Sequence, residues 1–424
     1  MNQFVFKTER EMKCSLGALF VICFISSVYA EKVRYDNYKI LNLKLNNLDK
    51  VAFIDKLKKL PAFSFLRNIE HNQDVLLAPK ELQKLAPLLK KANISSEILI
   101  DNIQEIIDDE EVKTKAAGDT FTWDRYQSYE SIQKFIDGII EDHPDVVTPF
   151  VIGKSYEGRE IRGIKISYKE GNRGIFLESN IHAREWITSA TCTYFINELV
   201  NSEDPDIRYI AENVDWYIIP VFNVDGFVYS HEKDRLWRKT RQPNTNPECP
   251  GADPNRNFDH TGITMKDLQE IHVMKHLEVF LLFLNPNVKL FLIIGIKDKI
   301  GVYLAYHSYG QYILSPYGHS KTEFPPNYND IQEIAKSSYD AILAQGYGTT
   351  YRYGSTGSVL YIASGSSVDY TYNELDIKIG YTFEFRDQGR YGFVLPSINI
   401  LPNCQETVAA MIALVKKAQE LSYL

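Results

Sequence analysis

The segment Asn180-Ile181-His182-Ala183-Arg184-Glu185-Trp186 decides how the rest of the chain is interpreted. His182 and Glu185 stand three residues apart, and in a helical turn that spacing places an imidazole and a carboxylate on one side, where a single metal ion can bind both. The pair alone is weak evidence, because a chain with nine histidines often contains such a spacing by chance. A third ligand is needed before the segment predicts a metal site.

His307 and Glu384 complete a possible metal site. His307 follows the apolar strand pattern Tyr303–Tyr306, and Glu384 lies within a similar pattern, Tyr381–Phe385. Two histidines and one glutamate, with a fourth position left for water, form a catalytic zinc set. An apolar setting raises the pKa of a carboxyl group, which suits Glu384 to act as a general base. Taken alone, His307 is better explained as a core histidine and Glu384 as an exposed glutamate on an edge strand.

Two arginine-containing segments, Arg235–Arg241 and Asp253–Asn257, lie between these positions. A planar guanidinium group can hold a carboxylate through two parallel hydrogen bonds, so we interpret them as clamps for an acidic group of a substrate. Solvated or ion-paired surfaces are the alternative. The chain carries 47 Lys and Arg against 55 Asp and Glu, a net charge of −8. A protein that neutralises phosphates needs a basic surplus, so we expect no nucleic-acid partner.

The N-terminus has the pattern of a secretory signal peptide over residues 1–30. The apolar run Leu16–Val28 follows a positive residue, Lys13, and Val28-Tyr29-Ala30 fits the small-x-small pattern of a cleavage site. The run is too short for a typical membrane span. We therefore expect a secreted, extracellular protein with no membrane association once the signal is removed. Removal leaves an odd number of cysteines: Cys192, Cys249 and Cys404.

The remaining chain divides into two predicted domains. Residues 31–115 show strand and helix patterns that predict a small α+β sandwich, with helices on one face of an antiparallel sheet. The acidic stretch Asp101–Glu111 is followed by Lys113 and Lys115, which stand ahead of small residues and are interpreted as an exposed connector that trypsin can cut. From 116 to 424, strands alternate with helices, which predicts an α/β domain: one mixed, twisted sheet covered by helices on both faces.

Five motifs together occur in the order and rough spacing of the zinc metallocarboxypeptidases. They are Asn180–Trp186, Arg235–Arg241, Asp253–Asn257, His307–Tyr309 and Phe383–Asp387. The chain resembles the secreted pancreatic-type procarboxypeptidases A and B, in a form similar to insect digestive enzymes. The resemblance implies one zinc ion per chain and hydrolysis of the C-terminal bond of peptides with a free C-terminus. It further implies a monomer that acts outside the cell, with the gut lumen as one such place. It also implies that residues 31–115 are an inhibitory pro-segment, removed by a trypsin-like protease at Lys113 or Lys115.

The resemblance assigns a role to each candidate site residue. Three positions match the zinc ligands: His182, Glu185 and His307. Three match groups around the reacting bond: Glu384 as the base, Arg238 as the group that polarises the scissile carbonyl, and Asp253 as the acceptor that orients His182. Six match substrate-binding positions: Asn255 and Arg256 for the terminal carboxylate, Tyr361 closing over it, and Arg184, Tyr309 and Phe393 in the subsites.

Substrate preference is implied by Val368, which matches the floor of the pocket for the C-terminal side chain. The B-type enzymes carry an acid there, so valine implies an A-type preference for aliphatic or aromatic residues. B-type specificity for basic residues remains an alternative. So does a catalytically impaired, secreted peptide-binding homologue. An endopeptidase or amidohydrolase would not need Asn255, Arg256 and Tyr361 together.

The resemblance is interrupted between residues 260 and 296. The family has a polar segment there, with a cysteine that pairs with the one matching Cys249, whereas this chain has apolar runs and no cysteine. The segment keeps the expected length, as two compensating reading-frame shifts would. We interpret it as an artefact of the gene sequence. A genuine divergence, which would leave Cys249 unpaired, is the alternative.

Overall fold

The computed structural model describes residues 31–424, except 59, 61–62, 70–71, 116–119, 245–248 and 259–295. The predicted signal peptide, and all but the last residue of the anomalous segment 260–296, lie outside the described residues. Cys192, Cys249 and Cys404 are all free. The first and last of these are buried, and Cys249 is exposed.

The N-terminal part folds as a four-stranded antiparallel sheet in the order β2-β3-β1-β4. Its elements are β1 (Lys39–Lys44), α1 (Leu48–Leu57), β2 (Ser64–Ile69), β3 (Asn72–Leu77), α2 (Pro79–Lys91) and β4 (Ser96–Ile100). Leu43, Val75 and Leu77 from the sheet pack with Leu85 of α2 in one buried cluster. This agrees with the predicted α+β sandwich, although β2 was not among the predicted strands.

Local sequence explains where these helices begin and end. Asn47 accepts a hydrogen bond from the Lys50 amide at 2.9 Å and so caps α1. Pro79 opens α2, where its missing N–H costs nothing. α2 ends at Lys91, and two residues later Asn93, with φ of 52°, turns the chain through the left-handed region that asparagine tolerates better than most residues.

The acidic segment after β4, which leads to the expected connector at Lys113 and Lys115, is helical. Residues Ile103–Lys115 form helix α3. Ile103, Ile107 and Glu110 stand at positions that share one face of a helix, and all three are at least 96% buried. Buried isoleucines at helical spacing favour a packed helix over a solvated linker, and the acidic residues between them obscured this pattern in the sequence.

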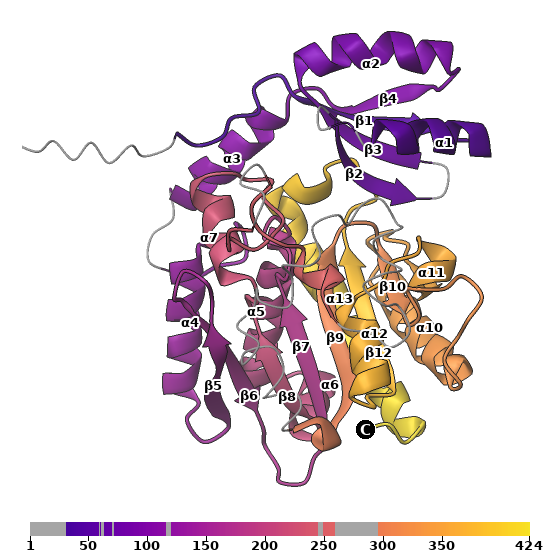
Figure 1. The fold of residues 1–424 in the computed structure, drawn as a ribbon. Helices are drawn as coiled ribbons and strands as arrows, with labels where there is room; N and C mark the ends of the chain where they lie inside the picture. The colour runs from indigo at the N-terminus through magenta and orange to yellow at the C-terminus, as the bar shows by residue number, and fades with distance from the viewer. Residues whose placement is uncertain are drawn as a thin grey trace, which may run out of the picture. The chain divides into compact units, whose positions relative to one another are not determined.

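The larger domain contains an eight-stranded sheet in the order β11-β10-β12-β9-β7-β8-β6-β5 (Figure 1). The strands are β5 (Val147–Lys154), β6 (Glu160–Ile166), β7 (Gly174–Ser179), β8 (Asp215–Ile219), β9 (Ile300–Ser308), β10 (Tyr312–Ser315), β11 (Arg352–Ser355) and β12 (Ile379–Phe385). The central strands β12, β9, β7 and β8 run parallel, and the outer pairs β5–β6 and β10–β12 run antiparallel. The predicted mixed sheet is confirmed.

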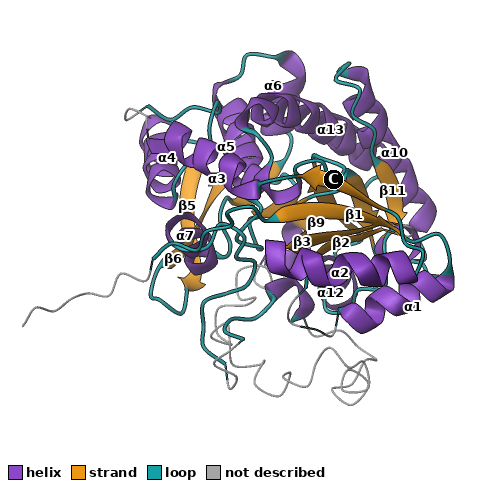
Figure 2. Cartoon of the chain, turned by 90° about the horizontal axis from the view of Figure 1, so that it is seen from above, coloured by secondary structure: helices purple, strands orange, loops and turns teal. Residues whose placement is uncertain are grey.

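Helices cover both faces of this sheet. They are α4 (Tyr129–Asp142), α5 (Trp186–Asn201), α6 (Pro205–Glu212), α7 (Val224–Glu232), α10 (Tyr328–Ala344), α11 (Thr356–Val359), α12 (Ser367–Glu374) and α13 (Ile400–Glu420). α10 and α13 lie on one side of the strands and α12 on the other (Figure 2). α13 is long and apolar enough to cross a membrane by composition alone, but Met411, Leu414 and Val415 are buried in the core. Its apolar composition is therefore that of a helix packed in the core of the domain.

The topology brings the chemically active residues to one edge of the sheet. β7, β9 and β12 are parallel, so their carboxyl ends meet. His307 is the second-last residue of β9, and Glu384 pairs with it in register on β12. His182 is the third residue after the end of β7. Ligands at the carboxyl ends of parallel strands are the common arrangement in α/β folds.

Candidate metal centre

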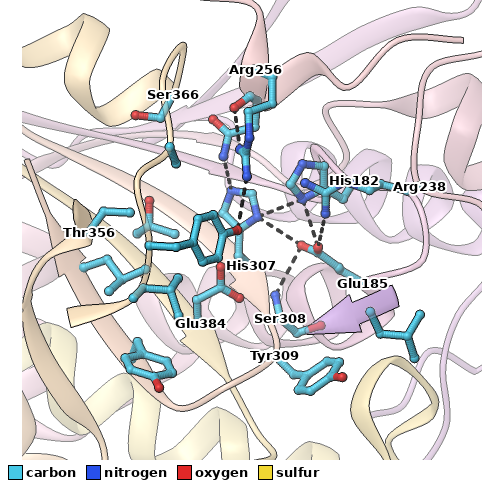
Figure 3. Close-up of a pocket in the computed structure, with 18 of the residues that line it drawn as sticks. His182, Glu185, Arg238, Arg256, His307, Ser308, Tyr309, Thr356, Ser366 and Glu384 are labelled. Carbon is cyan, nitrogen blue, oxygen red and sulfur yellow. Dashed lines mark hydrogen bonds and ion pairs between the residues drawn. The ribbon is translucent and has the colours of Figure 1, made fainter. Parts of the chain in front are cut away.

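His182, Glu185 and His307 converge at this edge (Figure 3). His182 Nδ1 lies 2.8 Å from Glu185 Oε1, and His307 Nδ1 lies 3.1 Å from Glu185 Oε2. The two Nδ1 atoms are 3.1 Å apart. All three residues are at least 98% buried. Within the part of the chain that the structure describes, this is the one group of histidine, cysteine and acidic side chains that could share a metal ion.

The connection between His182 and Glu185 differs from the expected helical turn. Residues 182–184 form a non-helical turn, and Glu185 is the N-cap residue of α5. Asn180, in the left-handed conformation with φ of 57°, precedes the turn. Its side-chain amide donates to the His182 carbonyl at 3.0 Å. The two candidate ligands therefore meet because this turn folds back before the helix starts.

The donor atoms fit zinc. His182 Nε2 faces Asp253 Oδ1 at 3.1 Å, so the carboxylate holds the proton on Nε2 and leaves the Nδ1 lone pair directed at the centre of the group. Although burial opposes ionisation, the two imidazoles hold the pKa of Glu185 well below its ordinary value. Two imidazole nitrogens and one ionised carboxylate are a zinc donor set with room for a fourth ligand.

Asp253 also holds Arg238. Its Oδ2 accepts a hydrogen bond from Arg238 Nε at 2.9 Å and forms an ion pair with Nη2 at 2.8 Å. Asp253 caps the 3-10 turn Pro254–Arg256 by accepting from the Asn255 amide at 3.0 Å. Although burial raises it, the charges of Arg238 and His182 bring the pKa of Asp253 well below its ordinary value. The remaining nitrogen, Arg238 Nη1, points at Glu185 Oε1, 3.6 Å away. A fixed guanidinium thus lies beside the candidate metal ligands.

Glu384 faces the same space from the neighbouring strand. Burial raises its pKa to about 7, because the opposing charge of His307 only partly offsets the burial. A carboxyl group with a pKa near neutrality can both accept and return a proton. The structure therefore brings a suitable base next to the candidate metal ligands.

Asn255, Arg256 and Tyr361 line the other side. Arg256 Nη2 donates to the Tyr361 hydroxyl at 3.1 Å, and Arg256 Nη1 donates to the Asn255 carbonyl at 2.8 Å. Asn255 Oδ1 accepts from the Ser367 amide at 2.9 Å, and Asn255 Nδ2 lies 3.3 Å from His307 Nε2. Amide and guanidinium donors thus gather within reach of the metal group.

One cavity of about 500 Å³ joins these groups. Its polar lining includes His182, Glu185, His307, Glu384, Arg238, Asn255, Arg256 and Tyr361. Part of its lining is apolar or carries hydroxyl groups: Tyr309, Tyr312, Leu314, Thr356, Leu360, Ala363, Thr382 and Phe393. The remaining wall comes from the N-terminal domain, through Lys58, Phe65, Leu66 and Gln73. The polar groups therefore open into a chamber that the N-terminal domain helps to enclose.

Two of the predicted substrate-binding residues do not line this cavity. Val368 is only 4% exposed and stands in the first turn of α12, so it lies behind the wall rather than at its surface. Arg184 stacks its guanidinium carbon 3.9 Å from the centre of the Phe393 ring and donates to the Leu236 carbonyl at 3.3 Å. Val368 therefore shapes the cavity only through its neighbours, and Arg184 through Phe393, which does line the cavity.

Contacts between the N-terminal domain and the larger domain surround the cavity. Arg235 donates to Glu110 from Nε at 2.8 Å and from Nη2 at 3.2 Å, and both side chains are at least 97% buried. The Tyr309 hydroxyl donates to Asp74 Oδ2 at 3.1 Å. Sequence reasoning missed the partnership of Glu110 with Arg235. The buried face of α3 was the signal that could have revealed it.

Comparisons with known proteins agree with this geometry. A family profile described as zinc carboxypeptidase matches residues 132–410, and one described as carboxypeptidase activation peptide matches residues 41–110. Zinc carboxypeptidase A 1 of Anopheles gambiae is 37% identical over 406 residues, which cover 93% of this chain and 92% of that protein. Carboxypeptidase A1 of Sus scrofa is 32% identical over 430 residues, covering 94% and 98%. The crystal structure of thrombin activatable fibrinolysis inhibitor matches with a TM-score of 0.80 at 26% identity, covering 90% of this chain and 98% of that one.

Proposed function

Because the chain belongs to the zinc carboxypeptidase family and carries its activation peptide, we propose that it is a secreted A-type enzyme that removes aliphatic and aromatic residues from peptide C-termini. The observation that carries this proposal is a single cavity in which a metal-binding group faces Asn255, Arg256 and Tyr361. Only a substrate with a free terminal carboxylate uses both halves of such a cavity.

The candidate residues divide the reaction between them. His182, Glu185 and His307 hold the zinc ion, one per chain, and Asp253 keeps His182 oriented. When bound, zinc supplies Lewis-acid polarisation and lowers the pKa of water. Glu384 takes the proton of the attacking water and passes it to the leaving nitrogen. Arg238, fixed by Asp253, stabilises the negative charge that develops on the scissile carbonyl oxygen.

The choice of terminal over internal bonds follows from the cost of an unpaired charge. Arg256 and Asn255 receive the terminal carboxylate, and Tyr361 closes over it. An internal peptide segment would cover the Arg256 guanidinium without supplying a negative charge. A buried, unpaired charge is strongly unfavourable, so internal bonds are rejected. Arg184, Tyr309 and Phe393 contact the preceding residues of the peptide, Arg184 through its stack on Phe393.

The A-type preference is supported by the chemistry of the cavity wall. Leu314, Leu360 and Thr382 line it, and the described lining residues contain no acid besides Glu185 and Glu384, which already have roles. A lysine or arginine side chain would find no carboxylate partner there. Val368 supports the same preference from behind, because it keeps the position apolar. Basic specificity is therefore disfavoured.

The precursor is latent because the N-terminal domain covers the cavity. Four of its residues form part of the cavity wall, and Glu110 and Asp74 bind side chains beside it. We take residues 1–30 as the signal peptide, 31–115 as the pro-segment and 116–424 as the catalytic domain. A trypsin-like protease cuts after Lys113 or Lys115 in the last turn of α3. The released enzyme acts as a monomer outside the cell, for which the gut lumen is one candidate location.

The test is to treat the purified precursor with trypsin and measure release of Phe, Leu and Lys from matched peptides, with and without a chelator. We expect Phe and Leu to be released far faster than Lys, and the chelator to abolish release. Faster release of Lys would overturn the A-type assignment. Activity that resists the chelator would overturn the metal site.

A further inference from the structure

A buried polar column behind the cavity has no role in the mechanism above. Glu178, near the end of β7, is 2% exposed, and Ser367, the first residue of α12, is fully buried. The Ser367 hydroxyl donates to Glu178 Oε1 at 3.2 Å. The Tyr303 hydroxyl is a further hydrogen-bond partner of the same carboxyl group. Burying a carboxyl group is costly, so this position calls for a specific reason.

The column continues from Ser367 to the cavity. The Ser367 amide donates to Asn255 Oδ1 at 2.9 Å. A backbone N–H can only donate, so it must face the oxygen of the Asn255 side chain and not its nitrogen. The Nδ2 end is therefore turned the other way, toward His307 and the cavity that Asn255 lines. The direction in which Asn255 presents its donor is set by the start of α12.

The start of α12 is in turn held by Glu178. Ser366 caps the helix by accepting from the Asp369 amide at 3.3 Å, but this bond lies within the helix and does not fix it to the sheet. The bond from Ser367 to Glu178 joins the helix to β7, a central strand of the sheet. Asp369 in the same turn also accepts from the Gly318 amide, at 2.9 Å, but the contact with Glu178 is the one that ties Ser367 to β7. Glu178 thus helps to set where the first turn of α12 lies relative to the central strands.

We propose that Glu178 is a positioning residue for substrate binding. Through the Ser367 hydroxyl it fixes the first turn of α12, and through the Ser367 amide it keeps the Asn255 Nδ2 donor directed at the terminal carboxylate of the substrate. This inference rests on the proposed function, which makes Asn255 a carboxylate-binding residue. Glu178 touches neither the substrate nor the reacting atoms, so its loss weakens binding of the carboxylate and leaves the chemical step intact.

The state of Glu178 supports a sharp conservative test. Burial raises the pKa of this carboxyl group, which favours the neutral acid. A glutamine side chain has nearly the same shape as the neutral acid and keeps an oxygen for the Ser367 hydroxyl. Glu178→Gln should therefore preserve the column, whereas Glu178→Ala removes it.

The experiment compares trypsin-activated wild type with Glu178→Gln, Glu178→Ala and Ser367→Ala on a blocked dipeptide ending in Phe. We expect KM to rise about tenfold in both alanine variants, with kcat within about twofold of wild type, and Glu178→Gln to remain close to wild type. The double variant should raise KM no further than either single alanine change, because one column is lost in each. Ser338→Ala is the matched control, since it removes a buried serine hydroxyl that bonds only to its own helix, at the Ile334 carbonyl.

Competitive ligands separate positioning from general loosening of the fold. A phenyl-bearing carboxylic acid should inhibit Glu178→Ala about tenfold more weakly than wild type, whereas the matching primary amide should inhibit both equally. A lowered melting temperature with unchanged KM and unchanged inhibition by the acid would overturn the proposal. Should Glu178→Ala not fold, Ser367→Ala is compared with wild type by the same ratios of KM and of inhibition by the acid. An inactive wild type would contradict the proposed function instead, so the two failures are distinguishable.

Discussion

Replacing Glu110 with alanine in the precursor should shorten the delay between cutting of the chain and the appearance of activity. Glu110 accepts two hydrogen bonds from Arg235, at 2.8 and 3.2 Å, in surroundings that leave almost no exposed surface on either side chain. After a cut at Lys113 or Lys115, the pro-segment stays in place only through such contacts. The variant removes the most deeply buried of the ion pairs that join the two domains.

The size of the effect follows from the burial of the pair. Removing one member of a buried ion pair typically costs about 3–5 kcal/mol. Arg235 keeps its bonds to the Arg184 and Phe393 carbonyls and its stack on Trp186, so we take the lower value, about 3 kcal/mol. That corresponds to roughly 100-fold weaker retention of the cut segment.

The assay follows cleavage on a gel and peptide hydrolysis in the same samples. Glu110 leaves with the pro-segment, so the mature enzyme from the variant has the same sequence as wild type, and any difference arises from the cut segment. Glu111→Ala is the control, because Glu111 pairs with Lys32 inside the pro-segment. We expect activity to lag behind cleavage in wild type and in the control, and to follow it closely in Glu110→Ala. An equal lag in all three proteins would refute the reasoning.

Three further predictions concern the mature enzyme. Glu384→Gln should lower kcat about 10³-fold, because the proton acceptor is lost, while an inhibitor with a free carboxylate still binds. Single-turnover assays check the rate, and titration calorimetry checks the binding of the inhibitor. Since burial raises the pKa of Glu384 to about 7 and the base must be ionised, kcat/KM should fall as the pH falls through the pKa of this residue. A bound cation lowers that pKa, so a pH profile should place the midpoint between the ordinary glutamate value and about 7. Leu360→Asp, which places a carboxylate on the apolar wall of the cavity, should shift the preference from Phe toward Lys and Arg by at least about tenfold, measured as a ratio of kcat/KM values on matched peptides.

The sequence predicted the metal-binding group because its chemistry depends on residue type and order. His182, Glu185 and His307 were found from one short spacing and one strand end, and the structure brings their ligand atoms within 4.8 Å of one another. The strands could also be predicted, because β9 and β12 are mostly apolar, as expected where both faces of a strand are covered.

Contacts between distant segments could not be read in the same way. Glu110 and Arg235 are 125 residues apart, and nothing in the order of residues pairs them. α3 was missed because its acidic residues conceal a face formed by Ile103, Ile107 and Glu110. Glu178 and Ser367 were missed for a related reason, since a lone acid in a strand gives no sign that a serine 189 positions later will bind it.

Asp253 has a consequence for how such a site can change. One of its oxygens serves His182 and the other serves Arg238, so two neighbours that differ in chemistry depend on a single side chain. Any replacement there disturbs both at once. A substitution at Asp253 therefore cannot change metal affinity without also changing the orientation of the Arg238 guanidinium. Either property can change separately only through residues that contact His182 or Arg238 but not both.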